Sequence, residues 1–95
     1  MAKFITRVEL HDARSDDYEV LHASMKAEGF ERTITASDGT TYHMPTAEYF
    51  RQDNTATRMD VLEAAKRAAT KTQKTCGVIV TEAVASTWWG LPLVG

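Results

Sequence analysis

The order of the periodic segments constrains this chain more than any other feature of its sequence: strand, helix, hairpin, helix and strand, then an apolar tail. Alternating side chains over Phe4–Leu10 predict a half-buried strand with Arg7 and Glu9 on its open face. Thr75–Ala83 is β-branched and apolar at its centre, which predicts a well-buried strand. We expect these two strands to be adjacent at the centre of one sheet.

Both helices carry start or stop signals. The first is predicted over about Asp16–Glu28, with Ser15 as its capping residue and Gly29 as its terminator, because glycine adopts positive φ without strain. The second is predicted from the capping box Thr57–Asp60 to about Thr70. A stripe of small residues along this second helix allows it to approach the sheet closely.

A hairpin is predicted between the two helices. Its arms are Phe30–Ala36 and Thr40–Tyr49, and they flank the Asp-Gly pair at 38–39, which favours a tight turn with positive φ. Pro45 has no backbone N–H, so the second arm should lie at an edge or bulge there. The polar segment 52–54 then reads as a connection.

These segments together predict an α+β fold, a ferredoxin-like two-layer sandwich with the order β-α-β-β-α-β and both helices on one face of the sheet. Residues 1–95 are enough for a single domain with one modest core. The apolar tail is a candidate extra C-terminal strand.

Composition excludes several classes of protein. The net charge of −2 provides no strong field that would draw the whole molecule onto a nucleic acid or an anionic membrane. The lone Cys76 excludes an internal disulfide and a cysteine-rich zinc site. The N-terminus turns polar too early for a signal peptide, and no apolar run approaches a membrane span. We therefore expect a cytoplasmic protein with no membrane partner, no metal and no small-molecule cofactor.

Candidate catalytic residues occur singly, because no phosphate loop, paired metal-spaced histidines or nucleophile elbow is present. They are Arg7, Asp12, His22 and Arg32. Asp12 follows the first strand, where it could accept a proton or hold a hydrated magnesium ion, or simply begin a turn. His22 either acts as a general acid or base or packs beside Tyr18 on the helix surface.

An RNA-binding surface is a further candidate. Arg7, Arg32 and His43 could share one sheet surface, with Tyr42 or Tyr49 as stacking rings for single-stranded RNA. The alternative is a set of solvated charges on an open sheet. The basic end of the second helix has the same two readings: a phosphate-contacting patch, or cations that favour the helix dipole.

Trp88 and Trp89 are candidate interface residues. Two adjacent indoles on an extended segment point to opposite faces, and one small monomer can hardly bury both. We expect one to pack inside the fold and the other to contact a second copy of the chain in a homodimer. The alternative is a closing flap that tucks both under the domain.

Several segments share their pattern with one family. They are Thr6-Arg7-Val8-Glu9-Leu10, Asp17-Tyr18 leading to Leu21 and Met25, Gly29-Phe30 with Arg32 to Thr35, and Val78-Ile79-Val80-Thr81-Glu82. In these positions the chain resembles the small GhoS-type antitoxins. That resemblance implies a ferredoxin-like endoribonuclease, similar to the small CRISPR-associated nucleases, that cleaves the messenger RNA of a membrane toxin.

The resemblance also marks a departure. His22 stands where the family has an arginine implicated in cleavage, so His22 takes over part of that role or the activity is absent. The leading hypothesis is a small endoribonuclease antitoxin that binds and cleaves toxin mRNA. The competing class is a non-catalytic, dimerising interaction or regulatory module, which the acidic balance of charge and the scattered candidates favour.

Overall fold

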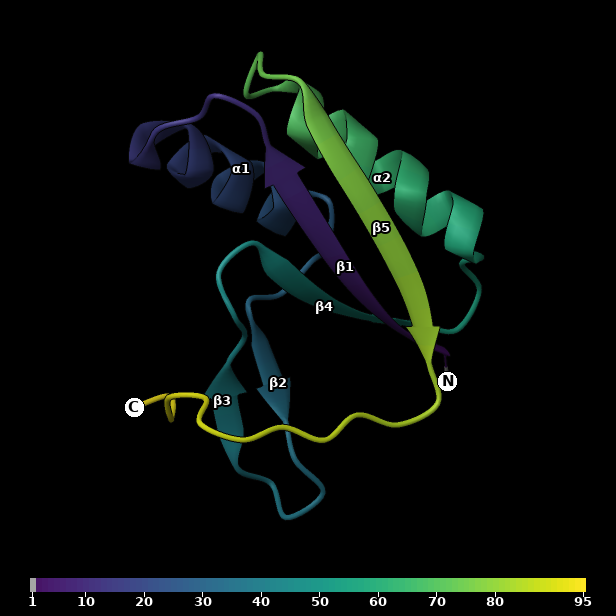
Figure 1. The fold of residues 1–95 in the computed structure, drawn as a ribbon. Helices are drawn as coiled ribbons and strands as arrows, with labels where there is room; N and C mark the ends of the chain where they lie inside the picture. The colour runs from purple at the N-terminus through teal and green to yellow at the C-terminus, as the bar shows by residue number, and fades with distance from the viewer. Residues whose placement is uncertain (1) are drawn as a thin grey trace.

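A three-stranded antiparallel sheet forms the centre of the molecule in the computed structural model, which describes residues 2–95 (Figure 1). Strand β1 (Ala2–Leu10) lies between β4 (Glu48–Asp53) and β5 (Cys76–Ala83). The remaining elements are helix α1 (Ser15–Ala27), helix α2 (Arg58–Thr70) and a separate hairpin of β2 (Thr33–Thr35) and β3 (Thr41–His43). The chain is thus an α+β protein, and β1 and β5 are adjacent as expected.

The alternation predicted for β1 is confirmed. Phe4, Thr6 and Val8 are buried, whereas Arg7 and Glu9 are exposed on the opposite face. Both helices lie behind the sheet in Figure 1 and cover the buried face. The apolar core comprises Phe4, Val8, Leu10, Leu21, Met25, Phe30, Tyr49, Val61, Ala64, Ala65, Ala68 and Ala69.

Helix α2 has the predicted cap. Thr57 accepts a hydrogen bond from the Asp60 N–H at 3.1 Å, and the Asp60 carboxylate accepts one from the Thr57 N–H at 2.9 Å. In α1 the prediction of Ser15 as the cap was wrong by one residue, because Arg14 is the N-cap and Ser15 begins the helix. Gly29 ends α1 as predicted, with a φ of 95°.

The Asp-Gly turn is present, but both arms of the hairpin are shorter than predicted, since β2 spans only Thr33–Thr35. Strand β3 ends at His43, and the backbone turns through Pro45 to Ala47, which has a φ of 65°. A new strand, β4, then pairs with β1 instead of with the hairpin. Segment 52–54 was predicted to be a connection, but its first two residues belong to β4. Proline cannot donate to the hairpin ladder, which is consistent with the strand ending there.

Strand β5 is less buried than predicted. It lies at the edge of the three-stranded sheet among residues 2–95, and none of its residues is fully buried. Val78 and Val80 pack against the core, whereas Ile79 on the other face is 63% exposed. Its β-branched composition correctly predicted a strand but not the position of that strand in the sheet.

The tail crosses from β5 to the hairpin (Figure 1). Leu93 forms a bridge with Tyr42, and the Pro92 carbonyl accepts a hydrogen bond from the His43 N–H at 2.8 Å. The expected extra C-terminal strand is therefore limited to a single bridge pair on β3 of the same chain. Across residues 2–95 no helix combines the length and the apolar character needed to cross a membrane.

Candidate functional site

A hollow between α1 and the β2–β3 hairpin brings together three of the predicted site residues: His22, Arg32 and His43. Helix α1 contributes His22 from its half-buried margin, and the hairpin and its leading segment contribute the other two. The hollow has a volume of about 600 Å³, and Lys26 also lines it. The structure thus brings two imidazoles and two cationic side chains together in one concave site.

His22 is held by a buried tyrosine. Its Nδ1 lies 2.7 Å from the hydroxyl of Tyr49, a β4 residue with 0% exposure. The ring centroids of His22 and Tyr49 are 5.9 Å apart, and those of His22 and Tyr18 are 6.5 Å apart. The predicted contact with Tyr18 is confirmed, whereas the burial of Tyr49 removes it from the candidate stacking rings. The bond at Nδ1 leaves Nε2 as the ring nitrogen for a ligand.

The surroundings favour neutral forms of both rings. Burial lowers the pKa of His22, the positive charge of Arg32 lowers it further, and Glu19 opposes both by raising it. Burial raises the pKa of Tyr49 to about 12, so its hydroxyl keeps its proton at neutral pH. A neutral imidazole with one nitrogen fixed can act as a general base through the other nitrogen.

The charges around the hollow are balanced. Arg32 and Lys26 form no ion pair within residues 2–95, so both cations are available to an anion. Glu19 and Glu31 line the same hollow and offset these two charges. The site can therefore contact one phosphate group but has no net positive charge to attract an extended polyanion.

The hairpin separates this hollow from a second concavity. Thr33 pairs with His43, and both line the hollow, whereas the next pair, Ile34 and Tyr42, lines a groove on the other face. This follows from the alternation of side chains along a strand. Tyr42 and His43 were predicted to serve one RNA surface, but they lie on opposite faces of the hairpin.

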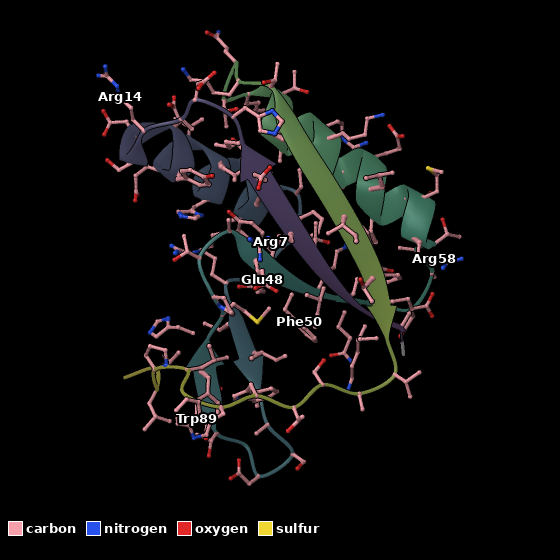
Figure 2. All side chains as sticks on the ribbon, viewed as in Figure 1. Arg7, Arg14, Glu48, Phe50, Arg58 and Trp89 are labelled. Carbon is pink, nitrogen blue, oxygen red and sulfur yellow. The ribbon has the colours of Figure 1, made fainter. Side chains whose placement is uncertain are left out.

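The other two catalytic candidates lie outside the hollow. Arg7 occupies the open face of β1, opposite Glu48 on β4 and Ile79 on β5 (Figure 2). Asp12 lies in the exposed loop after β1 with a φ of 52°, which fits a turn-forming aspartate. The structure therefore does not unite Arg7 and Asp12 with His22.

The basic end of α2 is largely paired with carboxylates. Lys66 lies 3.3 Å from Glu63, and Arg67 lies 2.9 Å from Glu28. Lys74, beyond the helix, lies 3.9 Å from Asp17. These ion pairs reduce the net charge that the segment can offer to a phosphate.

The two tail indoles differ in exposure, as their parity predicted. Trp88 is half-buried and packs edge to face on Tyr42, with ring centroids 5.5 Å apart. Trp89 is 96% exposed (Figure 2). One indole therefore packs within the chain, and the flap that would bury both is wrong.

One signal in the sequence could have revealed more of the hollow. Glu19, His22 and Lys26 have i, i+3 and i+7 spacing, which puts them on one face of a helix. The role of Tyr49 had no such signal, because it is 27 positions from His22.

Residues 2–95 contain no group of three or more His, Cys, Asp or Glu side chains arranged to hold a metal ion. Comparisons of the chain with protein-family models, curated proteins and solved structures found no match.

Proposed function

We propose that this protein is a small RNA-binding endoribonuclease whose site is the hollow around His22. The observation that carries the proposal is the convergence of His22, Arg32 and His43 on one hollow, with His22 fixed by Tyr49. The GhoS-type resemblance adds the antitoxin role and a toxin mRNA as the substrate.

The chemistry that fits these groups is attack of an RNA 2′-hydroxyl on the adjacent phosphorus. Nδ1–H of His22 donates to the Tyr49 oxygen, and Nε2 accepts the 2′-hydroxyl proton as the new oxygen–phosphorus bond forms. The bond from phosphorus to the 5′-oxygen breaks, and His43 gives that oxygen a proton. Arg32 stabilises the charge on the phosphoryl oxygens. The products are a 2′,3′-cyclic phosphate and a free 5′-hydroxyl.

We also propose that the fold is ferredoxin-like. Glu31 and Phe50 exchange backbone hydrogen bonds of 2.8 and 2.7 Å, so the segment leading into β2 contacts the free edge of β4. This gives the spatial order β5-β1-β4 followed by a fourth segment. We read that order as a ferredoxin-like sheet whose fourth strand is reduced to one bridge before it diverges into the hairpin.

The test is incubation of purified protein with a pool of end-labelled RNAs, in magnesium and in EDTA. We expect cleavage in both conditions and cyclic-phosphate ends. His22→Gln should slow cleavage by roughly 100-fold or more, as expected for loss of a general base. Arg32→Gln should also slow it, because the transition-state charge loses its cation.

Two matched variants control this experiment. His11→Gln and Arg58→Gln change the same residue types at exposed positions outside the hollow and should cleave like the wild type. Equal cleavage by all variants would indicate contamination or a different site. A folded wild-type protein that leaves every RNA intact would contradict the proposal that this protein is an endoribonuclease.

A second candidate function is a dimerising interaction module. The observation that favours it is the exposed apolar surface: Ile79 on the edge strand β5 and Trp89 on the tail. An edge strand with few charges favours pairing with another chain, and β5 has one charged residue, Glu82. We propose a second copy of this chain as that partner.

A further inference from the structure

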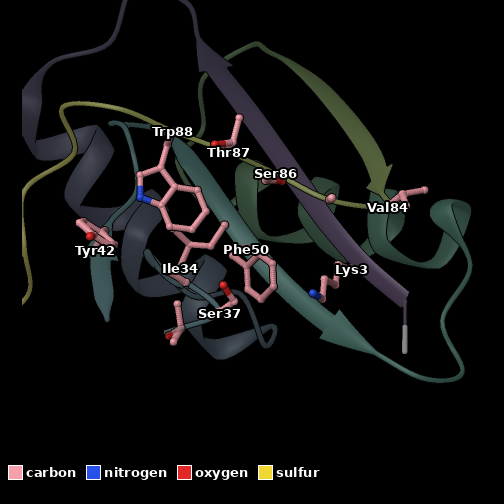
Figure 3. Close-up of a pocket in the computed structure, with 12 residues that line it drawn as sticks. Lys3, Ile34, Ser37, Tyr42, Phe50, Val84, Ser86, Thr87 and Trp88 are labelled. Atoms are coloured by element: carbon pink, nitrogen blue, oxygen red, sulfur yellow. The ribbon is translucent and has the colours of Figure 1, made fainter. Parts of the chain in front are cut away.

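We propose that the groove beneath Trp88 binds unpaired nucleotides of single-stranded RNA. This occupant rests on the proposed function, since it gives the RNA substrate a second contact site. The groove has a volume of about 710 Å³ and lies between the hairpin, the tail and the open face of the sheet (Figure 3). None of the sequence-based site predictions described such a groove.

Three aromatic rings line the groove: Tyr42, Phe50 and Trp88. Tyr42 and Trp88 meet at an interplanar angle of 70°, an arrangement that leaves both faces of one ring uncovered by the other. All three side chains are half-buried, so they are fixed in place and still reach solvent. Rings of this kind stack unpaired bases with little preference for sequence.

The single positive charge of the groove favours an anionic ligand. Lys3 is the one charged side chain among its lining residues, and no Asp or Glu lines it. In the view of Figure 3, Lys3 and Tyr42 lie at opposite ends, with Phe50 and Trp88 between them. A base on the rings and a phosphate on the ammonium group of Lys3 would satisfy both features. Hydroxyls of Ser37, Ser86 and Thr87 also line the groove and can bond to a sugar or phosphate.

The groove lies close enough to the hollow to hold an RNA that is cleaved there. Tyr42 on its wall and His43 in the hollow are consecutive residues of β3 with side chains on opposite faces. The hollow has balanced charge, so cleavage there needs substrate affinity from elsewhere. A strand held by its bases in the groove can supply that affinity and continue over the hairpin to His22.

Binding can be tested separately from cleavage with a 2′-O-methyl oligouridylate of about eight nucleotides, a length within the usual range of single-strand sites. This probe lacks the attacking hydroxyl. In a Trp89→Phe background Trp88 is the remaining tryptophan, and we expect its fluorescence to be quenched as the probe binds. A labelled probe followed by anisotropy gives the Kd of each further variant.

Tyr42→Leu should weaken binding roughly tenfold, as expected for one lost base–aromatic stack. Lys3→Gln should weaken the salt dependence of binding. The negative slope of the logarithm of the association constant against the logarithm of the salt concentration should decrease in magnitude by about 0.7, the value for one phosphate contact with a single strand. Arg58→Gln makes the same charge change at the start of α2, outside the groove, and should alter neither quantity. Lys3 is exposed, so its substitution tests the groove even if Tyr42→Leu misfolds.

Unquenched Trp88, or equal Kd values and salt slopes for wild type, Tyr42→Leu and Lys3→Gln, would overturn the groove proposal. Cleavage of RNA without these binding effects would leave the enzyme proposal intact and overturn the groove proposal. Binding with the expected variant pattern but no cleavage of unmodified RNA would support the groove and contradict the enzyme.

Discussion

The side chain of His22 depends on three neighbours from three segments of the chain: Glu19 on the same helix, Arg32 before β2, and Tyr49 on β4. Tyr49 fixes one ring nitrogen, while Arg32 and Glu19 act on its pKa in opposite directions. Removal of each charge should therefore shift the pKa of His22 with a different sign. Arg32→Gln should raise it, and Glu19→Gln should lower it, because the cation disfavours the imidazolium and the carboxylate favours it.

Titration of the histidine ring protons by NMR measures both shifts. The His11 signal comes from a residue outside the hollow and reports any global effect of the substitutions. Shifts of equal sign in the two variants would mean that these side chains do not act on His22 by charge.

The same pKa predicts how stability depends on pH. The pKa of folded His22 lies below its ordinary value of 6.5, so between the two values the unfolded chain binds more protons than the folded one. This contribution to the free energy of unfolding is fully present above pH 6.5 and is lost as pH falls through 6.5 toward the folded pKa. Urea unfolding of wild type and His22→Gln over this window should show the loss in the wild type alone.

Sequence reasoning reached individual residues of the hollow but not their arrangement. His22, Arg32 and His43 were each identified by residue type, because imidazole and guanidinium groups suit RNA chemistry. The Tyr49 contact depends on β4 pairing with β1 below α1, which no local pattern encodes. Parity along β3 places Tyr42 and His43 on opposite faces, but it does not tell which face carries the hollow, because that depends on where α1 lies relative to the hairpin.

At the scale of elements, local signals predicted both helices and the strand type of β1 and β5. The cap of α2 was predicted correctly because its hydrogen bonds join residues close in sequence, Thr57 and Asp60, whereas the cap of α1 lies one residue before the predicted one. The position of β5 at the edge and the division of the second hairpin arm into β3 and β4 depend on long-range pairing. Composition does not report that pairing.

The cap of α2 provides a prediction at this scale. Thr57→Ala removes the hydroxyl that accepts the Asp60 N–H and should lower the free energy of unfolding by about 1 kcal/mol. Chemical denaturation measures the change. The exposed Thr46, in the turn before β4, provides a control, and its replacement by alanine should change stability by less than about 0.5 kcal/mol. Equal effects of the two substitutions would show that the cap does not stabilise α2.

At the scale of the whole molecule, the exposed large apolar side chains include Ile79 on the edge strand β5 and the indole of Trp89. Trp88 already packs on Tyr42 within the chain, so Trp89 is the indole available to a partner. Leu93 also forms a bridge with Tyr42, so tail residues on both sides of Trp89 contact the hairpin.

We therefore predict a homodimer that buries Trp89. Truncation of a tryptophan at the centre of an interface costs on the order of 2 kcal/mol, and a homodimer carries the substitution in both copies, so Trp89→Ala should weaken dimerisation by at least roughly 30-fold. Ile79→Lys tests the other route, since a lysine on the edge strand β5 should oppose pairing of that strand with a second copy without affecting a dimer held by the tail. Sedimentation equilibrium of the wild type and both variants separates these routes. A wild-type protein that stays monomeric at high concentration would contradict both, because neither apolar surface would then hold a second copy.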